Sequence, residues 1–186
     1  MDRSTILQWN CRGFRANFEE LKLLSSKQDI NIIALQEIKL KPTDSSSLLG
    51  YDFYKKCMLS SNDSATGGTA VLIKKGTPHH ALTLNTELQA VAVRVSLHTL
   101  VTVCSIYLPP GRRPDDSAKL DHLLSQLPPP VLLLGDFNAH SDLWGEQVSR
   151  PNSHILENFI DNNDLCLLNN GAYTYLHPAS GTFSAI

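Results

Sequence analysis

The fold of this chain is indicated by residues 131–138, Val-Leu-Leu-Leu-Gly-Asp-Phe-Asn. The apolar run is too short for a helix and is typical of a strand that is buried on both faces. It ends at Asp136 and Asn138, and residues i and i+2 of an extended chain point to the same side. The stretch therefore predicts a strand that carries a carboxylate and an amide side by side at its end. An Asx turn that closes a core strand is the alternative interpretation.

The composition is typical of a globular chain. Of its 186 residues, 42% are hydrophobic and 18% are charged, which excludes a disordered chain. No apolar run reaches the ~20 residues that a membrane-spanning helix needs, and the first residues lead into a predicted strand without a signal peptide. We therefore expect one domain over residues 1–186 of an intracellular protein, in the nucleus or cytoplasm, that is neither secreted nor bound to a membrane.

The charge and the cysteines narrow the possible functions. The net charge of −2 argues against a protein that binds nucleic acid through positive charge alone, but not against an enzyme that handles phosphate through a bound cation. The cysteines are scattered without a Cys-x-x-Cys pair, at Cys11, Cys57, Cys104 and Cys166. We expect buried, reduced thiols rather than a disulfide framework or a zinc site.

Local patterns predict strands mixed with a few helices. Helices are expected at residues 17–28, at 115–127 and from 152 or 153 onward, and the first is expected to begin with a capping box of Asn17 and Glu20. Besides the run before Asp136, strands are expected at residues 5–10, 30–36, 51–56, 69–74, 88–97, 99–108, 166–168 and 181–186. His79 and His80 are expected in an exposed turn. This order predicts two sheets packed face to face, with helices outside.

Polar side chains end three further strands of this pattern. Asn10 ends the first strand, Glu37 follows the second, and Tyr107 ends the hairpin. A single polar residue at the end of a core strand is ordinary capping, and a tyrosine there is more often part of the core. An amide, an acid and a phenol at corresponding strand ends indicate instead a site at one edge of the sheets.

Short motifs containing these residues lie along the chain in a fixed order. They are Gln8-Trp9-Asn10, Leu35-Gln36-Glu37, Gly67-Gly68-Thr69-Ala70-Val71, Ile106-Tyr107, Gly135-Asp136-Phe137-Asn138 and Gly181-Thr182-Phe183. In this order they resemble the endonuclease/exonuclease/phosphatase family, the group of DNase I-like and apurinic-endonuclease-like phosphodiesterases. Residues 9–13, 36–40 and 135–140, followed by 143–145, are most similar to the endonucleases of non-LTR retrotransposons. The resemblance implies an α/β fold, a four-layer α/β/β/α sandwich of two mixed sheets.

The resemblance also implies a divalent-metal phosphodiesterase that nicks DNA. Glu37 is expected to hold Mg²⁺ or Mn²⁺ with Asn10 beside it, since these ions prefer hard oxygen ligands. Asp136 is expected to deprotonate the attacking water, Asn138 to hold phosphate or water, and Tyr107 to donate to a phosphate oxygen. Expected contacts to the substrate come from Arg12, Lys39, Thr182 and His140.

The chain departs from the family pattern near its end. The family completes its site with an Asp after the Gly-Thr-Phe strand and with a Ser-Asp-His segment, and no Ser-Asp-His occurs in these 186 residues. We therefore expect a domain that lacks its C-terminal strands and has little activity by itself. The resemblance further implies a monomeric domain whose longer parent polyprotein carries a reverse transcriptase.

Two other functions remain open. A phosphoinositide phosphatase or sphingomyelinase would use the same fold, although no membrane-facing insertion is seen in the sequence. A catalytically dead, DNA-binding remnant would explain the missing His. The Asp-x-Asn-x-His string that ends at His140 also resembles a metallophosphatase cluster, but the further Gly-Asp and Gly-Asn-His segments of that pattern are absent.

Overall fold

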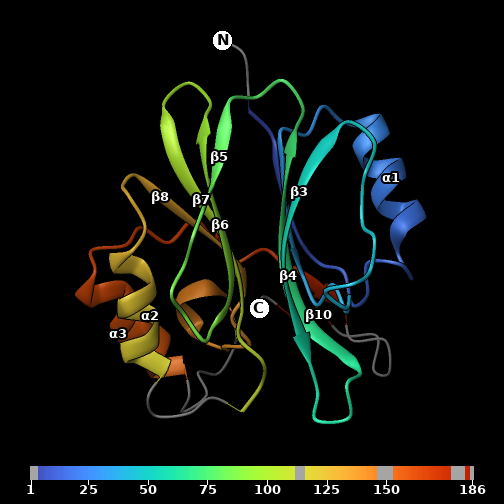
Figure 1. Cartoon of the computed structure of the whole chain (residues 1–186). Helices are drawn as coiled ribbons and strands as arrows, with labels where there is room; N and C mark the ends of the chain where they lie inside the picture. The colour runs from blue at the N-terminus through green and yellow to red at the C-terminus, as the bar shows by residue number, and fades with distance from the viewer. Residues whose placement is uncertain (1–3, 112–115, 146–152, 177–182, 185–186) are drawn as a thin grey trace. The chain divides into compact units, whose positions relative to one another are not determined.

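Most of the chain's strands belong to two four-stranded sheets (Figure 1). The computed structural model describes residues 4–111, 116–145, 153–176 and 183–184. The chain divides into two compact units, of which the first comprises Met1–Tyr107 and Ser125–Asp136 and the second Leu108–Leu124 and Phe137–Ile186. Both four-stranded sheets lie within the first unit, so that the packing of one sheet on the other belongs to a single body.

The first sheet has the strand order β1-β2-β4-β3. Its strands are β1 (Ile6–Asn10), β2 (Ile32–Gln36), β3 (Tyr51–Leu59) and β4 (Ala65–Lys74). Helix α1 (Phe18–Lys27) connects β1 to β2, which allows these two strands to run parallel, whereas β4 is antiparallel to both of its neighbours. The parallel pair places Asn10 opposite Gln36, so that Asn10 and Glu37 leave the sheet at the same edge.

The second sheet has the strand order β5-β6-β7-β8. Its strands are β5 (His79–Leu82), β6 (Gln89–Ser96), β7 (Leu100–Tyr107) and β8 (Val131–Asp136). Here β7 and β8 are the parallel pair, and Tyr107 lies opposite Asp136 at the carboxyl ends of the two strands. Each sheet therefore ends two neighbouring strands with polar groups of the predicted site.

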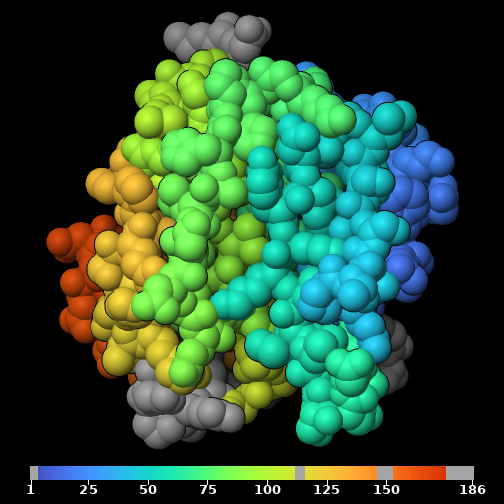
Figure 2. All heavy atoms as spheres, in the orientation of Figure 1, coloured from blue at the N-terminus to red at the C-terminus, as the bar shows by residue number. Residues whose placement is uncertain are grey.

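Branched aliphatic side chains join the inner faces of the two sheets. The fully buried members of this cluster are Ile32, Val71 and Ile73 from the first sheet and Val93, Val95 and Val103 from the second. In Figure 2, atoms of β3 in cyan lie against atoms of the β5–β6 segment in green, in agreement with the contacts between β3 and β6. The loss of this apolar surface from water is the main force that holds the sheets together.

Helix α1 covers the outer face of the first sheet (Figure 1). Leu21 on the helix packs in one core cluster with Ile33, Leu35 and Leu72 of the sheet. The ring of Phe14 meets that of Phe53 edge to face, with centroids 5.2 Å apart, and so closes the cluster at the end of the helix. Two mixed sheets with a helical outer layer confirm the α/β sandwich predicted from the sequence.

The second unit contains α2 (Asp116–Ser125), the short 3₁₀ helix η1 (Asp142–Trp144), α3 (Ser153–Asn162) and an antiparallel pair, β9 (Tyr175–Leu176) and β10 (Phe183–Ser184). The buried Trp144 donates its Nε1–H to Ala139 O at 3.0 Å, which fixes the turn after residue 138. In the part of the chain that the structure describes, no helix combines the length and the apolar character needed to span a bilayer.

Four local predictions were wrong. Residues 79–82 form strand β5 instead of a turn, and the His79 side chain is largely buried against Tyr54. Residues 166–168 have no regular structure. The strand before Asp136 is only half-buried over most of its length, because β8 is the edge strand of its sheet among the strands that the structure describes. Finally, Asn17 makes no side-chain cap, and its Nδ2 donates to Cys11 O at 2.7 Å.

Candidate active site

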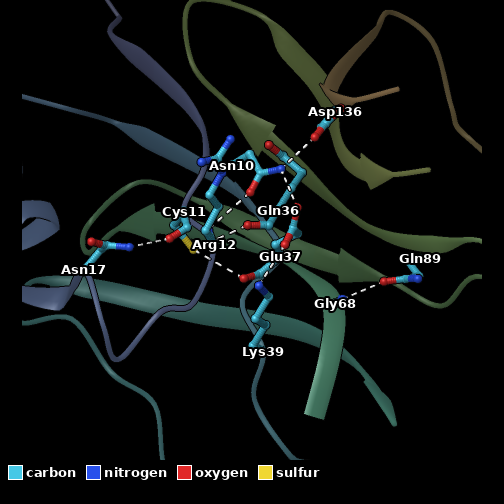
Figure 3. Close-up of polar contacts among 10 residues, drawn as sticks. All are labelled: Asn10, Cys11, Arg12, Asn17, Gln36, Glu37, Lys39, Gly68, Gln89 and Asp136. Carbon is cyan, nitrogen blue, oxygen red and sulfur yellow. Dashed lines mark hydrogen bonds and ion pairs between the residues drawn. The ribbon is translucent and has the colours of Figure 1, made fainter. Parts of the chain in front are cut away.

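Four of the predicted site residues come together at one edge of the two sheets. The side-chain amide of Asn10 lies between two carboxylates and donates to both, at 2.9 Å to Glu37 Oε1 and at 2.6 Å to Asp136 Oδ2 (Figure 3). The hydroxyl of Tyr107 is also hydrogen-bonded to Glu37. The two parallel strand pairs thus bring two carboxylates, an amide and a phenol into one cluster.

The backbone around the site adopts an unusual conformation. Glu37 has φ of 50° directly after β2, and Lys39 and Arg12 each have φ of 49° in the loops after β2 and β1. Non-glycine residues rarely adopt this left-handed conformation, because Cβ then crowds the backbone. Three such residues in two neighbouring loops indicate that the surrounding structure holds these loops in place.

The loop that carries Glu37 is held by hydrogen bonds that it donates to the start of β4. Ile38 N donates to Gly68 O at 3.3 Å and Lys39 N to Gly67 O at 2.9 Å. Gly68 N in turn donates to Gln89 Oε1 of the other sheet at 2.5 Å, as Figure 3 shows. A Cβ atom at residue 67 would lie 2.4 Å from the same Gln89 oxygen, which explains the glycine at this position.

The charge of Glu37 is stabilised by its neighbours. Burial by itself would raise the pKa of this carboxyl, but hydrogen bonds from Asn10, Lys39 and Tyr107 and the charge of Lys39 lower it below its ordinary value of 4.5. Lys39 Nζ lies 3.0 Å from Glu37 Oε2, and the Lys39 side chain is itself exposed. Glu37 is therefore an ionised, pre-oriented carboxylate at neutral pH.

The pKa of Tyr107 is shifted in the opposite direction to that of Glu37. The burial of Tyr107, followed by the nearby charges of Glu37 and Asp136, raises the pKa of the phenol above its ordinary value of 10.0. The hydroxyl consequently keeps its proton at any physiological pH and can act as a hydrogen-bond donor. Asp136, beside it, is a buried carboxylate at the end of β8.

Of the remaining predicted residues, Arg12 and Lys39 belong to the unit that carries the cluster. Arg12 and Lys39 are exposed, and the backbone N–H of Arg12 donates to Asn10 Oδ1 at 3.2 Å. Asn138 and His140 belong to the second unit, where the His140 backbone is hydrogen-bonded to the hydroxyl of Ser153. Thr182 lies outside the described residues.

The extended geometry predicted for Asn138 was wrong. Strand β8 ends at Asp136, and Asn138 has φ of 46°, so the rule that residues i and i+2 share a side does not apply. Its Nδ2 donates to Leu108 O at 2.9 Å. A role of Asn138 in holding phosphate stays a prediction.

Buried polar residues that the motifs do not single out as functional support the cluster from inside the sandwich. These are Gln36, Thr69 and Ser105, all fully buried, and Gln89, which is nearly so. A signal was available, since each is a polar residue at an inward-facing position of an otherwise apolar strand. Local patterns do not reveal their partners, because these lie on strands that are distant in sequence.

Comparisons with known proteins identify relatives of the chain. The family model described as endonuclease-reverse transcriptase matches residues 101–185. The RNA-directed DNA polymerase from mobile element jockey of Drosophila melanogaster is 32% identical over 173 residues, which covers 90% of this chain and 18% of that protein. The Drosophila melanogaster protein described as a probable RNA-directed DNA polymerase from transposon BS is 26% identical and covers 100% of this chain. The chain spans about a fifth of the length of these relatives, 18% and 21%.

Solved structures show the same fold. The endonuclease domain of TRAS1, a telomere-specific non-LTR retrotransposon, superposes with a TM-score of 0.75 at 18% identity and covers 98% of this chain and 81% of that one. The Neisseria 3′ phosphatase NExo bound to a product DNA hairpin superposes with a TM-score of 0.70 at 17% identity, covering 96% of this chain and 80% of that one. The chain therefore belongs to the endonuclease/exonuclease/phosphatase family predicted from its motifs, and its relatives lie among the proteins of retrotransposons.

Proposed function

We propose that this chain is a divalent-metal-dependent phosphodiesterase that nicks DNA. The observation that supports the proposal is the placement of Glu37 and Asp136 on one shared amide, that of Asn10, with Tyr107 beside them. The retrotransposon relatives and the structural likeness to a phosphatase bound to DNA support DNA as the substrate. A reverse transcriptase in a longer parent polyprotein is part of the same proposal.

The donor set of the site fits a hard divalent cation. Mg²⁺ and Mn²⁺ are commonly bound through one or two carboxylates, with water and substrate phosphate completing the coordination shell. The cluster offers two carboxylates, and among the described residues no group of three or more His, Cys, Asp or Glu side chains lies close enough together to hold a metal ion without further ligands. A bound cation would supply positive charge to the phosphate. Glu37 would hold it.

Asn10 orients the carboxylate of Glu37, the proposed ligand of the cation. An amide oxygen facing two carboxylates would be repelled, so the Nδ2 group faces Glu37 and Asp136, and Oδ1 accepts from the backbone of Arg12. One side chain thereby fixes the positions of both carboxylates. We propose that Asn10 lies beside the cation. Its amide would hold the Glu37 side chain in the rotamer that binds the cation.

The other groups act on phosphate and water. Asp136 accepts the proton of the attacking water, and the protonated hydroxyl of Tyr107 donates to a phosphate oxygen as negative charge develops. The exposed cations of Arg12 and Lys39 contact the DNA backbone. Among the residues from the second half of the chain, Asn138, His140 and Thr182 contribute to substrate binding.

Nicking of supercoiled plasmid with Mg²⁺ tests the proposal. Enzyme in excess over plasmid makes slow, single-turnover nicking visible. The Asp136→Asn variant should nick more slowly by a factor on the order of 10²–10⁴, the contribution of a positioned proton acceptor. The matched control is Asp161→Asn on the exposed side of α3, which should nick at the wild-type rate. Unaltered nicking by Asp136→Asn would remove Asp136 from the mechanism.

A substrate panel separates this function from its alternatives. DNA, an inositol phosphate and sphingomyelin are each incubated with the protein and Mg²⁺, and released product is measured. Hydrolysis of DNA alone supports the proposal, whereas hydrolysis of either lipid-derived substrate assigns the site to that chemistry. Salt-dependent binding of DNA without cleavage at any Mg²⁺ or Mn²⁺ concentration would identify a catalytically dead binding domain.

A further inference from the structure

A layer of polar side chains lies between the two sheets directly beneath the candidate active site. Gln36 of β2, Thr69 of β4 and Ser105 of β7 are each 0% exposed. Gln36 Nε2 donates to Ser105 Oγ at 3.0 Å, and Ser105 Oγ lies 2.5 Å from Thr69 Oγ1. At the open edge of this layer, Gln8 Nε2 of β1 donates to Gln36 Oε1 at 2.6 Å.

The two hydroxyls of this layer share one carbonyl acceptor. Thr69 Oγ1 lies 2.9 Å and Ser105 Oγ 3.2 Å from Leu35 O, and the two hydroxyls are 2.5 Å apart, so one of them donates to Leu35 O and either can donate to the other. Ser105 then accepts from Gln36, and the oxygen of Gln36 accepts from Gln8. A continuous set of hydrogen bonds therefore runs from Gln8 to Leu35 O, and it holds the Gln36 amide between the two sheets.

Three members of the layer, Gln8, Gln36 and Ser105, lie one or two residues before a residue of the site. Gln8 and Asn10 share a face of β1, and Ser105 and Tyr107 share a face of β7, because residues i and i+2 of a strand point the same way. Gln36 directly precedes Glu37. The layer therefore couples the strand that ends at Tyr107 to the strands that end at Asn10 and Gln36.

The backbone of Gln36 connects to the same site. Gln36 O accepts from Cys11 N at 3.0 Å and from the Cys11 thiol at 3.4 Å, immediately after Asn10. Its side chain reaches the second sheet and its carbonyl reaches the end of β1. Gln36 is thus bonded to both sides of the gap that Asn10 and Asp136 bridge.

We propose that Gln36, acting through Ser105, is a positioning residue that sets the separation between Asn10 and Glu37 on one sheet and Tyr107 and Asp136 on the other. The inference rests on the proposed function of the site but concerns a residue that touches neither phosphate nor cation. Apolar side chains of similar volume would fill the same space without any requirement for paired hydrogen bonds. The polar layer instead imposes a single lateral register of the sheets at the level of the site.

The test uses the Gln36→Met/Ser105→Ala double variant. It removes both partners of the central hydrogen bond, leaves the Thr69–Leu35 bond intact and strands no buried donor, so the protein should still fold. The matched control is Tyr54→Phe. That change breaks the hydrogen bond from Tyr54 to His79 Nε2, 2.9 Å, which links β3 and β5 away from the site.

Two readouts are measured for each variant. In plasmid nicking, the double variant should lose about 10²-fold in kcat, the effect of misplacing reactive groups by about 1 Å, with KM for DNA unchanged. In the NMR spectrum, the side-chain amide of Asn10, assigned by its loss in Asn10→Asp, should move toward the position of a solvent-exposed amide. Tyr54→Phe should change neither quantity.

The single variants show whether the effect of the double variant comes from a folding defect. Ser105→Ala and Gln36→Met, each compared with wild type by thermal unfolding, should show the same displaced Asn10 resonance at temperatures well below their Tm. Wild-type kcat and an unmoved Asn10 amide in a folded double variant would overturn the proposal. Should the wild-type chain fail to nick any plasmid, the proposed function fails, while the Asn10 resonance still decides whether Gln36 positions the cluster.

Discussion

The amide of Asn10 donates to the carboxylate of Asp136 at 2.6 Å, although 126 residues separate the two in sequence. Asn10 ends β1 of the first sheet and Asp136 ends β8 of the second. The same Nδ2 donates to Glu37 at 2.9 Å, so one neutral group separates two carboxylates that would otherwise repel each other. The geometry of the site therefore depends on a residue without charge.

Replacing Asn10 with alanine should destabilise the protein. Two hydrogen bonds to carboxylates are lost together, and a hydrogen bond to a charged group contributes about 1.5–3 kcal/mol. Urea denaturation should show a lower free energy of unfolding, and millimolar Mg²⁺ should restore part of it, because a cation can neutralise the two carboxylates that lose the Asn10 amide. The control is Asn85→Ala in an exposed loop. Equal stability of Asn10→Ala and wild type would contradict the bridging role of this amide.

Removing the positive charge of Lys39 should strengthen metal binding and weaken DNA binding. Lys39 Nζ pairs with Glu37 Oε2 at 3.0 Å and so competes with a cation for that carboxylate. An exposed ion pair contributes about 0.2–1 kcal/mol, so Lys39→Met should lower the Kd for Mn²⁺ by about 1.4- to 5-fold. Electron paramagnetic resonance of free Mn²⁺ measures this affinity.

The control for that change is Lys41→Met. Lys41 lies two residues further along the same loop and pairs with Asp63 instead, at 3.3 Å. The Lys41→Met variant should bind Mn²⁺ with the wild-type affinity. A weaker Mn²⁺ affinity in Lys39→Met than in wild type would show that the ammonium group assists the cation rather than competing with it.

Gly135 is required by the close approach of β7 to β8. A Cβ at this position would lie 2.0 Å from Ile106 O and 2.8 Å from Ile106 Cγ2. Gly135→Ala must therefore push the strands apart, at a cost of about 1–3 kcal/mol or more in unfolding free energy. Nicking should slow as well, since Tyr107 and Asp136 directly follow the displaced residues. Ser96→Ala, at the exposed end of β6, serves as the control in both assays.

The buried thiol of Cys104 gives a pH-dependent prediction. Burial raises its pKa from 9.0 to about 12, whereas Cys166 is exposed. At pH 8 a thiol-specific reagent should label Cys166 at once and Cys104 only after denaturation. Above pH 9 the unfolded thiol ionises and the folded one does not, so the unfolding free energy should fall as the pH rises from 9.0 toward about 12. Cys104→Ala should show a smaller decline over this range, and an equal decline would contradict the assignment.

The convergence of the site could be predicted from the sequence because it follows from strand geometry. Asn10, Glu37, Tyr107 and Asp136 are each marked by an apolar run that stops at a polar residue. Two parallel strand pairs then bring these ends to one edge, as the registers of β1 with β2 and of β7 with β8 show. The order of the family's motifs indicated which strand ends meet at one site, and local patterns do not contain this information.

The predictions that failed depend on tertiary contacts. Asn138 was expected to continue an extended chain, but it turns into a left-handed conformation. His79 resembles a turn residue by itself, yet strand pairing with β6 and the hydroxyl of Tyr54 recruit it into the sheet. Asn17 and Glu20 match a capping box, but the side-chain amide of Asn17 donates a hydrogen bond to Cys11 O. In each case a contact outside the local pattern outweighed the local preference.

The left-handed loops at Arg12, Glu37 and Lys39 set a limit on engineering this domain for heat resistance. Each non-glycine residue in that conformation stores about 1–3 kcal/mol of strain. A screen that rewards melting temperature alone would favour glycine at these three positions, and it would delete the carboxylate and both cations of the site. Thermostable descendants of this chain would therefore have to gain their stability from the valine and isoleucine layer between the sheets, and leave these loops strained.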